Sequence, residues 1–219
     1  MADIFDEIEE DLRRDKMNLL WQRYGNYILG LAVLIIIGVA GNQGYDYWHE
    51  SKTQAAGNQF FEAVTAEDSL EALISIESDL PDGYKMLARF RVAALYAEEG
   101  DLAAAEQAFL DLSADTSIDV FYKNTALLLS VMNAPRSADK NQLINRISAL
   151  AEFPGPLQGL ALETSAGLYL EAGLTNKAIA SLTMASSLTE IPASLRQRIT
   201  QALSILSNKY ADISAEKTE

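Results

Sequence analysis

The chain has 219 residues, of which 49% are hydrophobic and 22% are charged, so it carries enough apolar side chains to bury a core. It contains no cysteine, which excludes disulfides, thiolate nucleophiles and cysteine-ligated zinc. Asp and Glu number 31 against 17 Lys and Arg, for a net charge of −14. Because this charge repels phosphate backbones, we expect no nucleic-acid partner.

The first 23 residues form a charged segment with a weak apolar stripe. Ile4, Phe5, Ile8 and Leu12 recur at helical spacing, with acidic residues early and basic residues late, as a helix dipole favours. One interpretation is a short cytoplasmic helix that docks on a partner. The other, which we prefer because such stripes are common, is a solvated lead-in to the next segment. Its acidic first turns argue against adsorption on anionic lipid.

Residues 24–48 are predicted to form a single transmembrane helix. The stretch from residue 24 to residue 45 carries no charge, and at about 1.5 Å per residue it is long enough to cross a hydrocarbon core of roughly 30 Å. Aromatic residues frame it, as membrane interfaces favour. They are Trp21, Tyr24, Tyr27, Tyr45, Tyr47 and Trp48. The prediction implies contact with membrane lipid.

The basic residues around this segment predict its orientation. Arg13, Arg14, Lys16 and Arg23 precede it, whereas Lys52 alone follows closely. By the positive-inside rule, residues 1–23 stay in the cytoplasm and the rest of the chain is exported.

Two other interpretations of the apolar segment remain. A signal peptide cleaved at Ala40 is conceivable, but the preceding segment is long and acidic for a signal. A buried core helix would not explain the aromatic frame. Within the segment, Ala40 and Gly44 form a small-xxx-small pair of the kind that contacts a second membrane helix.

Everything after residue 50 reads as helix, with no sustained alternation of strand type. Breaks fall at Pro and Gly, and Ser69 is a plausible N-cap. The predicted helices are Ser51–Thr65, Ser69–Leu80, Tyr84–Glu99, Leu102–Ser113, Ile118–Met132, Ala138–Ala151, Pro156–Ala172, Thr175–Leu188 and Ala193–Asn208. They make a helical domain over residues 49–212, and residues 213–219 are expected to be a flexible tail.

An internal repeat organises this helical domain. The stretch "VAALYAEEGDLAAAEQAF" aligns with "SAGLYLEAGLTNKAIASL". In both, a Gly follows a Tyr by four residues and precedes an Ala by five. The aligned positions are Ala93, Tyr96, Gly100, Ala105 and Phe109 in the first, and Ala166, Tyr169, Gly173, Ala178 and Leu182 in the second. This spacing is that of the tetratricopeptide repeat, a pair of antiparallel helices.

Each repeat position has a steric reason. The Gly stands where the chain reverses and adopts positive φ at little cost, whereas in a helix interior it would cost about 1 kcal/mol. The alanines let the two helices approach closely, and the Tyr, Phe and Leu fill space against the next pair. Residues 59–76 and 119–150 are expected to be degenerate pairs. The fold class is therefore all-α, an N-terminal transmembrane helix followed by a tetratricopeptide-like solenoid of three or four stacked pairs.

The sequence offers little for catalysis. The one histidine, His49, stands at the predicted membrane interface, so a catalytic triad or a multi-histidine metal site cannot form within one chain. Neither GxxxxGK[ST] nor GxGxxG occurs. The acidic run at residues 97–101 is more simply an exposed turn than an acid–base site. We therefore expect no enzyme activity, cofactor or metal.

A peptide-binding groove is easier to argue. First helices of stacked pairs line the concave side, and apolar groups among acids there suit a peptide. The candidates are Leu87, Phe90 and Glu98 in one repeat, and Glu163, Leu170 and Glu171 in the other. The alternative, which the sequence leaves equally open, is that Leu87, Phe90 and Leu170 pack against neighbouring pairs.

The chain resembles the YfgM-like ancillary subunits of the SecYEG protein-export translocon. The resemblance rests on "GYDYW" closing the apolar segment, "FFEAV", "GYKMLARFRVAALYAEEGDLAAAEQAF" and "LETSAGLYLEAGLTNKAIASL". The predicted cytoplasmic tail is longer than this resemblance leads us to expect.

This resemblance implies a non-enzymatic subunit of the bacterial inner membrane, with a cytoplasmic N-terminus and a periplasmic tetratricopeptide domain. The implied partners are the Sec translocon, a membrane-anchored periplasmic chaperone and exported polypeptides. A structural or assembly subunit of another inner-membrane complex is the alternative that the residues leave open.

Overall fold

The computed structural model describes residues 37–39, 43, 47 and 51–216, with side chains as far as residue 207. These residues include no strand, which confirms the all-α prediction. The chain divides into two compact units, Met1–Asn58 and Gln59–Glu219. The predicted segment 1–23 and most of the predicted span 24–48 lie outside the described residues. No helix in the described part of the chain has the length and apolar character needed to cross a membrane.

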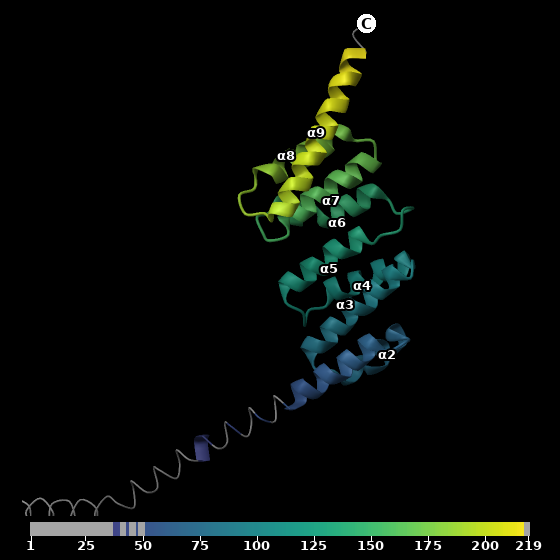
Figure 1. Cartoon of the computed structure of the whole chain (residues 1–219), viewed down its shortest axis with the longest axis vertical. Coiled ribbons are helices and arrows are strands. Elements are labelled where there is room, and N and C mark those ends of the chain that lie inside the picture. The colour runs from purple at the N-terminus through teal and green to yellow at the C-terminus, as the bar shows by residue number, and fades with distance from the viewer. Residues whose placement is uncertain (1–36, 40–42, 44–46, 48–50, 217–219) are drawn as a thin grey trace, which may run out of the picture. The chain divides into compact units, whose positions relative to one another are not determined.

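The second unit is a succession of short helices (Figure 1). Residues 51–65 are helical and lead into it. The elements that follow are α2 (Ser69–Ile76), the 3-10 turn η1 (Glu77–Asp79), α3 (Asp82–Glu98), α4 (Leu102–Ala114), α5 (Val120–Met132), α6 (Lys140–Glu152), α7 (Gln158–Glu171), α8 (Thr175–Ser187) and α9 (Ala193–Glu216).

Most of these bounds lie within two residues of the predicted ones, with two exceptions. The predicted helix Ser69–Leu80 gives way to η1, and Leu80 is extended, with ψ 143°, because Pro81 disfavours helical backbone in the residue before it. The last helix continues to Glu216, eight residues beyond its predicted end, because no Gly or Pro follows Pro192 to stop it.

Four of the helices begin with an aspartate cap. Asp68, Asp101, Asp119 and Asp139 accept hydrogen bonds from backbone N–H groups in the first turns of α2, α4, α5 and α6. The prediction of Ser69 as the cap of α2 was wrong by one residue. The carboxylate of Asp68 accepts the N–H of Glu71 at 3.0 Å, and its negative charge also suits the helix dipole.

The core passes from one helix group to the next along the unit. A first cluster joins α3, α4 and α5, a second joins α5, α6 and α7, and a third joins α7, α8 and α9. The first cluster contains Ala93, Phe109, Leu112, Ile118 and Ala126. Helices α5 and α7 each contribute to two clusters, so every helix pair depends on its neighbours for burial, as in other repeat folds.

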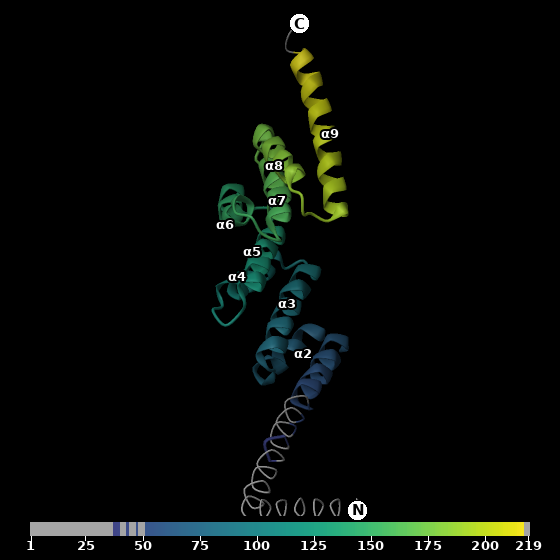
Figure 2. The same cartoon turned by 90° about the vertical axis from the view of Figure 1, so that its left-hand side faces the viewer.

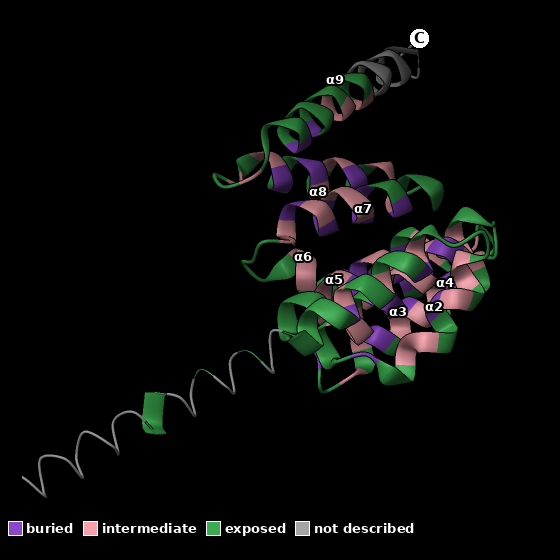
Figure 3. Ribbon diagram, turned by 60° about the horizontal axis from the view of Figure 1, so that its bottom comes forward, coloured by how far each residue is buried: buried purple, intermediate pink, exposed green. Residues whose placement is uncertain are grey.

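Helix α9 closes the end of the unit. Its inner face buries Leu195 and Ile199 against α7 and α8. Its outer face carries Gln197, Gln201 and Ser204, all exposed. Figure 3 shows α9 as mainly exposed over its described side chains. This polar outer face is what a terminal capping helix requires.

Candidate protein-binding surface

The two repeat turns have the same backbone structure. Gly100 and Gly173 have φ of +86° and +73°, and no other described residue has positive φ. The N–H of Gly100 donates to the Ala97 carbonyl at 3.2 Å, and the next N–H donates to the Tyr96 carbonyl at 2.9 Å. The turn at Gly173 repeats both bonds, at 3.0 and 2.7 Å. This is the Schellman arrangement, so each Gly ends its helix in the left-handed conformation.

The small repeat positions are fully buried. Ala93, Ala105, Ala166 and Ala178 are all at most 1% exposed. The bulky positions are buried beside them: Phe109 is 2% exposed and belongs to the first cluster, and Leu182 is 3% exposed and belongs to the third. These six of the ten aligned residues therefore lie in the core of the helical domain.

The two repeat tyrosines are half-buried. Tyr169 packs against the second and third clusters, and the Lys177 ammonium lies 5.6 Å from its ring centroid. That distance is within the range of a cation–π contact. Tyr169 therefore links successive core clusters.

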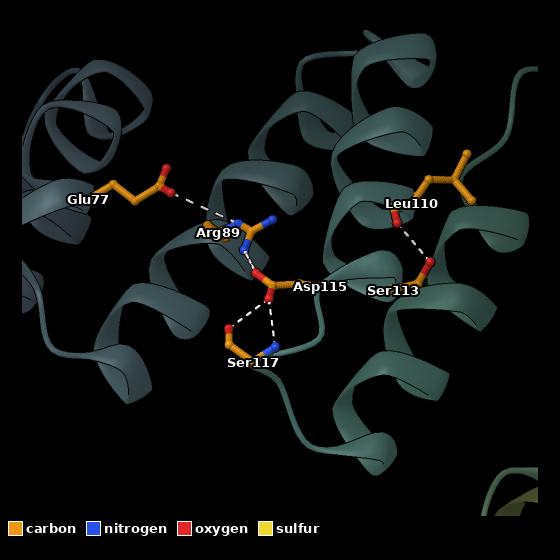
Figure 4. Close-up of polar contacts among 6 residues, drawn as sticks. All are labelled: Glu77, Arg89, Leu110, Ser113, Asp115 and Ser117. Atoms are coloured by element: carbon orange, nitrogen blue, oxygen red, sulfur yellow. Dashed lines mark hydrogen bonds and ion pairs between the residues drawn. The ribbon is translucent and has the colours of Figure 1, made fainter.

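Arg89 links its own helix α3 to η1 and to the α4–α5 loop (Figure 4). Its guanidinium donates to Asp115 in the α4–α5 loop and lies 3.9 Å from the Glu77 carboxylate of η1. The pKa of Asp115 is lowered to about 2, first by hydrogen bonds from the hydroxyl and backbone N–H of Ser117 and then by Arg89. The carboxylate therefore stays ionised and fixes the loop that leads into α5.

Three predicted groove residues lie on α3. Leu87 is exposed, at 45%. The Phe90 ring lies 6.2 Å from the Phe109 ring and packs against the first cluster, as the packing alternative expects. Glu98 pairs with Arg91 of the same helix at 2.7 Å.

The other three predicted groove residues lie on α7. Leu170 is 40% exposed. Glu163 accepts two hydrogen bonds from Arg198 of α9, at 2.7 and 2.8 Å, and Glu171 pairs with Lys140 of α6 at 2.9 Å. The Glu163 carboxylate raises the pKa of Arg198, first through their hydrogen bond and then through the attraction between their charges. These acids therefore tie α7 to its neighbours, and the grouping of the six residues into one groove stays a prediction.

A different apolar surface lies where α5 begins and α6 ends. The α5–α6 cleft has a volume of about 530 Å³. Its lining residues are Asp119, Val120, Phe121, Asn124, Ala149, Leu150, Phe153, Pro154, Gly155, Pro156, Leu157 and Gln158. Three large apolar members stay in contact with water: Val120 is 62% exposed, Phe121 45% and Phe153 63%. Such a concentration of uncovered apolar side chains makes the cleft a candidate binding surface.

The packing of α5 and α6 explains the opening. They pack through Leu128 and Val131 of α5 and Leu143, Ile144 and Ile147 of α6, which form the second cluster. The first turn of α5 and the last turn of α6 lie beyond that contact and line the cleft. Pro154 then ends α6, because the residue before a proline avoids helical backbone, and Phe153 is extended with ψ 142°.

A second cleft lies on the other side of the loop at residues 154–156, with a volume of about 570 Å³. It is bounded by α7 and the α8–α9 loop, and it is lined in part by Leu188, Ile191 and Arg198. Beside it, a Cβ on Gly159 would lie 2.9 Å from Cγ2 of Ile191, so α7 and this loop approach closely.

None of the six predicted groove residues lines either cleft. Val120, Phe121 and Phe153 are not among the site residues predicted from the sequence. The signal that points to them is local: "DVFY" places three bulky side chains on the first turn of a helix, so they cannot all face the core. "FPGP" places a further aromatic residue on an exposed loop.

Comparison with known proteins identifies the repeat architecture. Residues 19–147 match the family of the tetratricopeptide repeat-like domain. No curated protein and no solved structure matches the chain significantly. The match starts before the uncharged stretch and ends before the second repeat turn at Gly173, and it covers more than half of the sequence. The helical repeats and this match together show that the chain belongs to the tetratricopeptide repeat-like domain family.

Proposed function

We propose that the protein is a non-enzymatic, membrane-anchored interaction subunit that holds polypeptide partners on its helical domain. Tetratricopeptide repeat-like domains typically serve as interaction modules without catalysis. The observation that carries the proposal is the α5–α6 cleft, where Val120, Phe121 and Phe153 leave an apolar surface uncovered.

The anchor is supported by the sequence. The uncharged stretch of residues 24–45 lies inside the range that matches the family, which supports its assignment to the same architecture as the first repeats. Its aromatic frame and the basic residues before it favour a single span with a cytoplasmic N-terminus and an exported helical domain.

The specific partners are proposed from the resemblance to the YfgM-like subunits. We propose that the protein belongs to the Sec translocon of the bacterial inner membrane, and that its periplasmic domain contacts a membrane-anchored chaperone and exported chains. A net charge of −14 is compatible with a surface that meets protein and not nucleic acid.

The topology can be tested by labelling, because the chain has no cysteine of its own. Thr116→Cys, in the exposed α4–α5 loop, and Ala2→Cys give one thiol each. In intact spheroplasts, a membrane-impermeant maleimide is expected to label the Thr116→Cys variant and spare the Ala2→Cys variant. The reverse pattern, or labelling of both, would contradict the proposed orientation.

The partners can be tested by native purification in mild detergent and identification of the subunits that co-purify. Channel subunits and a membrane-anchored chaperone are the expected result. Subunits of a different inner-membrane complex, without channel components, would instead support a structural or assembly role there.

A further inference from the structure

We propose that the α5–α6 cleft binds an extended polypeptide segment in which one or two large apolar side chains stand next to a lysine or arginine. This inference rests on the proposed function, and it names the class of polypeptide that this surface accepts. The surface lies at the end of the pair where α5 begins and α6 ends, and none of the six groove residues predicted on α3 and α7 lines it.

The wall of the cleft accounts for the apolar side chains. Val120 and Phe121 from α5, Leu150 from α6 and Phe153 from the following loop converge on one space of about 530 Å³. This volume is within the range of sites that enclose a small ligand or a few side chains. Covering the exposed surfaces of Val120, Phe121 and Phe153 would remove apolar area from water, which favours binding.

Two amide side chains are the reason to expect that the bound segment has an extended backbone. Asn124 lines the cleft. Its side-chain amide forms no hydrogen bond with any residue that the structure describes. Gln158 donates a hydrogen bond from its Nε2 to the Ala151 carbonyl at 3.2 Å, and its Oε1 accepts none from the residues that the structure describes. An amide supplies both a donor and an acceptor, and this matches the unpaired N–H and C=O groups of an extended chain. A helical ligand has already paired those groups.

The charges near the cleft are the reason to expect a lysine or arginine in the bound segment. Asp119 lines the cleft, and Glu152 immediately precedes Phe153. Neither carboxylate forms an ion pair with a residue that the structure describes. The basic residue that follows Asp119 is Lys123, one turn further along α5. The second unit as a whole, residues 59–219, holds 22 acidic and 12 basic residues, a net charge of −10. This charge attracts Lys and Arg and repels an acidic segment.

The test uses the purified full-length protein in phosphatidylcholine nanodiscs and two fluorophore-labelled 12-residue peptides. Both peptides carry a central Leu-Phe-Leu, one flanked by lysines and one by glutamates, and binding to empty nanodiscs is subtracted. We expect the lysine peptide to bind at least tenfold more tightly than the glutamate peptide at low salt, with a difference that narrows as salt rises.

Variants locate the binding. Phe153→Ser is expected to weaken binding of the lysine peptide at least tenfold, whereas Phe61→Ser, at an equally exposed phenylalanine (67%) outside the cleft, should leave it unchanged. Asp119→Asn with Glu152→Gln should reduce the preference for lysine over glutamate, and asparagine preserves the helix cap.

Three outcomes would overturn the inference: no binding above empty nanodiscs, equal binding of the two peptides, or equal losses in the Phe153→Ser and Phe61→Ser variants. The proposed function has a separate readout. If the Phe153→Ser variant still co-purifies with channel subunits while no peptide binds the wild type, the interaction role stands and this assignment of the cleft fails.

Discussion

Two helix pairs of the same domain are built differently. The α3–α4 pair turns within residues 99–101 through a glycine with positive φ, and buried Ala93 and Ala105 allow its helices to approach closely. The α5–α6 pair turns over residues 133–139, which contain no glycine, and its helices contact each other less extensively. Figure 2 shows α3 with α4, and α5 with α6, in the same unit.

The difference shows where a binding surface can arise in a repeat protein. The first pair buries Phe109, whereas the second leaves Phe121 and Phe153 in contact with water. A closed hairpin buries its aromatic residues and is stabilised by them, whereas a hairpin that opens at one end leaves aromatic residues accessible to a partner. The residues that define the repeat are therefore not the residues expected to bind.

The largest expected effect comes from truncating one phenylalanine in each pair. Phe109→Ala should lower the free energy of unfolding by about 3 to 5 kcal/mol, since it opens a cavity at a 2% exposed site. Phe153→Ala, at a 63% exposed site, should change it by no more than about 0.5 kcal/mol. Chemical denaturation followed by circular dichroism measures both. Comparable losses would mean that the cleft is part of the core.

The next effect distinguishes two glycines by sign. Gly100→Ala should destabilise by roughly 1 to 2 kcal/mol because its φ of +86° is strained for any residue with a Cβ. Gly167→Ala should stabilise by about 0.5 to 1 kcal/mol, because Gly167 lies in the interior of α7 with open space where the Cβ would stand. Thermal melting of the two variants side by side checks this. A stabilising Gly100→Ala would show that the turn is not left-handed.

The two repeats differ at the cap of the second helix, which gives a smaller pair of effects. Asp101 caps α4 through the Ala104 N–H at 3.0 Å, whereas Leu174 stands at the same place before α8 and offers no side-chain cap. Asp101→Ala should cost about 1 kcal/mol, and Leu174→Asp should recover part of that amount in the other repeat. Denaturant midpoints measure both changes. If Leu174→Asp destabilised the protein, contacts of the leucine would outweigh the missing cap.

The smallest effect is a pH dependence at Asp115. Its pKa is about 2 in the folded protein and near its usual 3.8 in the unfolded chain, so the unfolded chain binds the proton first as pH falls. The stabilisation is therefore complete above about pH 4 and is lost as pH falls towards 2. Wild type and Asp115→Asn should differ in melting temperature at pH 5 and converge at pH 2. A constant difference across that range would contradict the assignment.

The helices and the repeat turns could be predicted from the sequence because they follow local rules. The spacing around Gly100 and Gly173 predicted the two repeat turns, and breaks at Pro and Gly placed most helix ends within two residues. The α5–α6 cleft could not be predicted in this way, because it depends on how two helices of a degenerate pair diverge. That divergence is a tertiary property with no fixed residue pattern.

The predicted groove shows the same limit at single residues. Phe90 was placed on a possible binding face, but it packs against Phe109. Glu163 meets Arg198, which is 35 residues away in the sequence. Helix periodicity indicates which side of a helix a residue occupies, but it does not indicate which later helix will cover that side.

Site-specific photocrosslinking in intact cells tests the central claim most directly, with a benzophenone amino acid at residue 153 and a matched one at residue 61. Because residue 153 lines the α5–α6 cleft and residue 61 does not, the account predicts crosslinks to exported chains or translocon-associated proteins from residue 153, well above those from residue 61. Crosslinks from residue 61 alone, or none from residue 153, would contradict it.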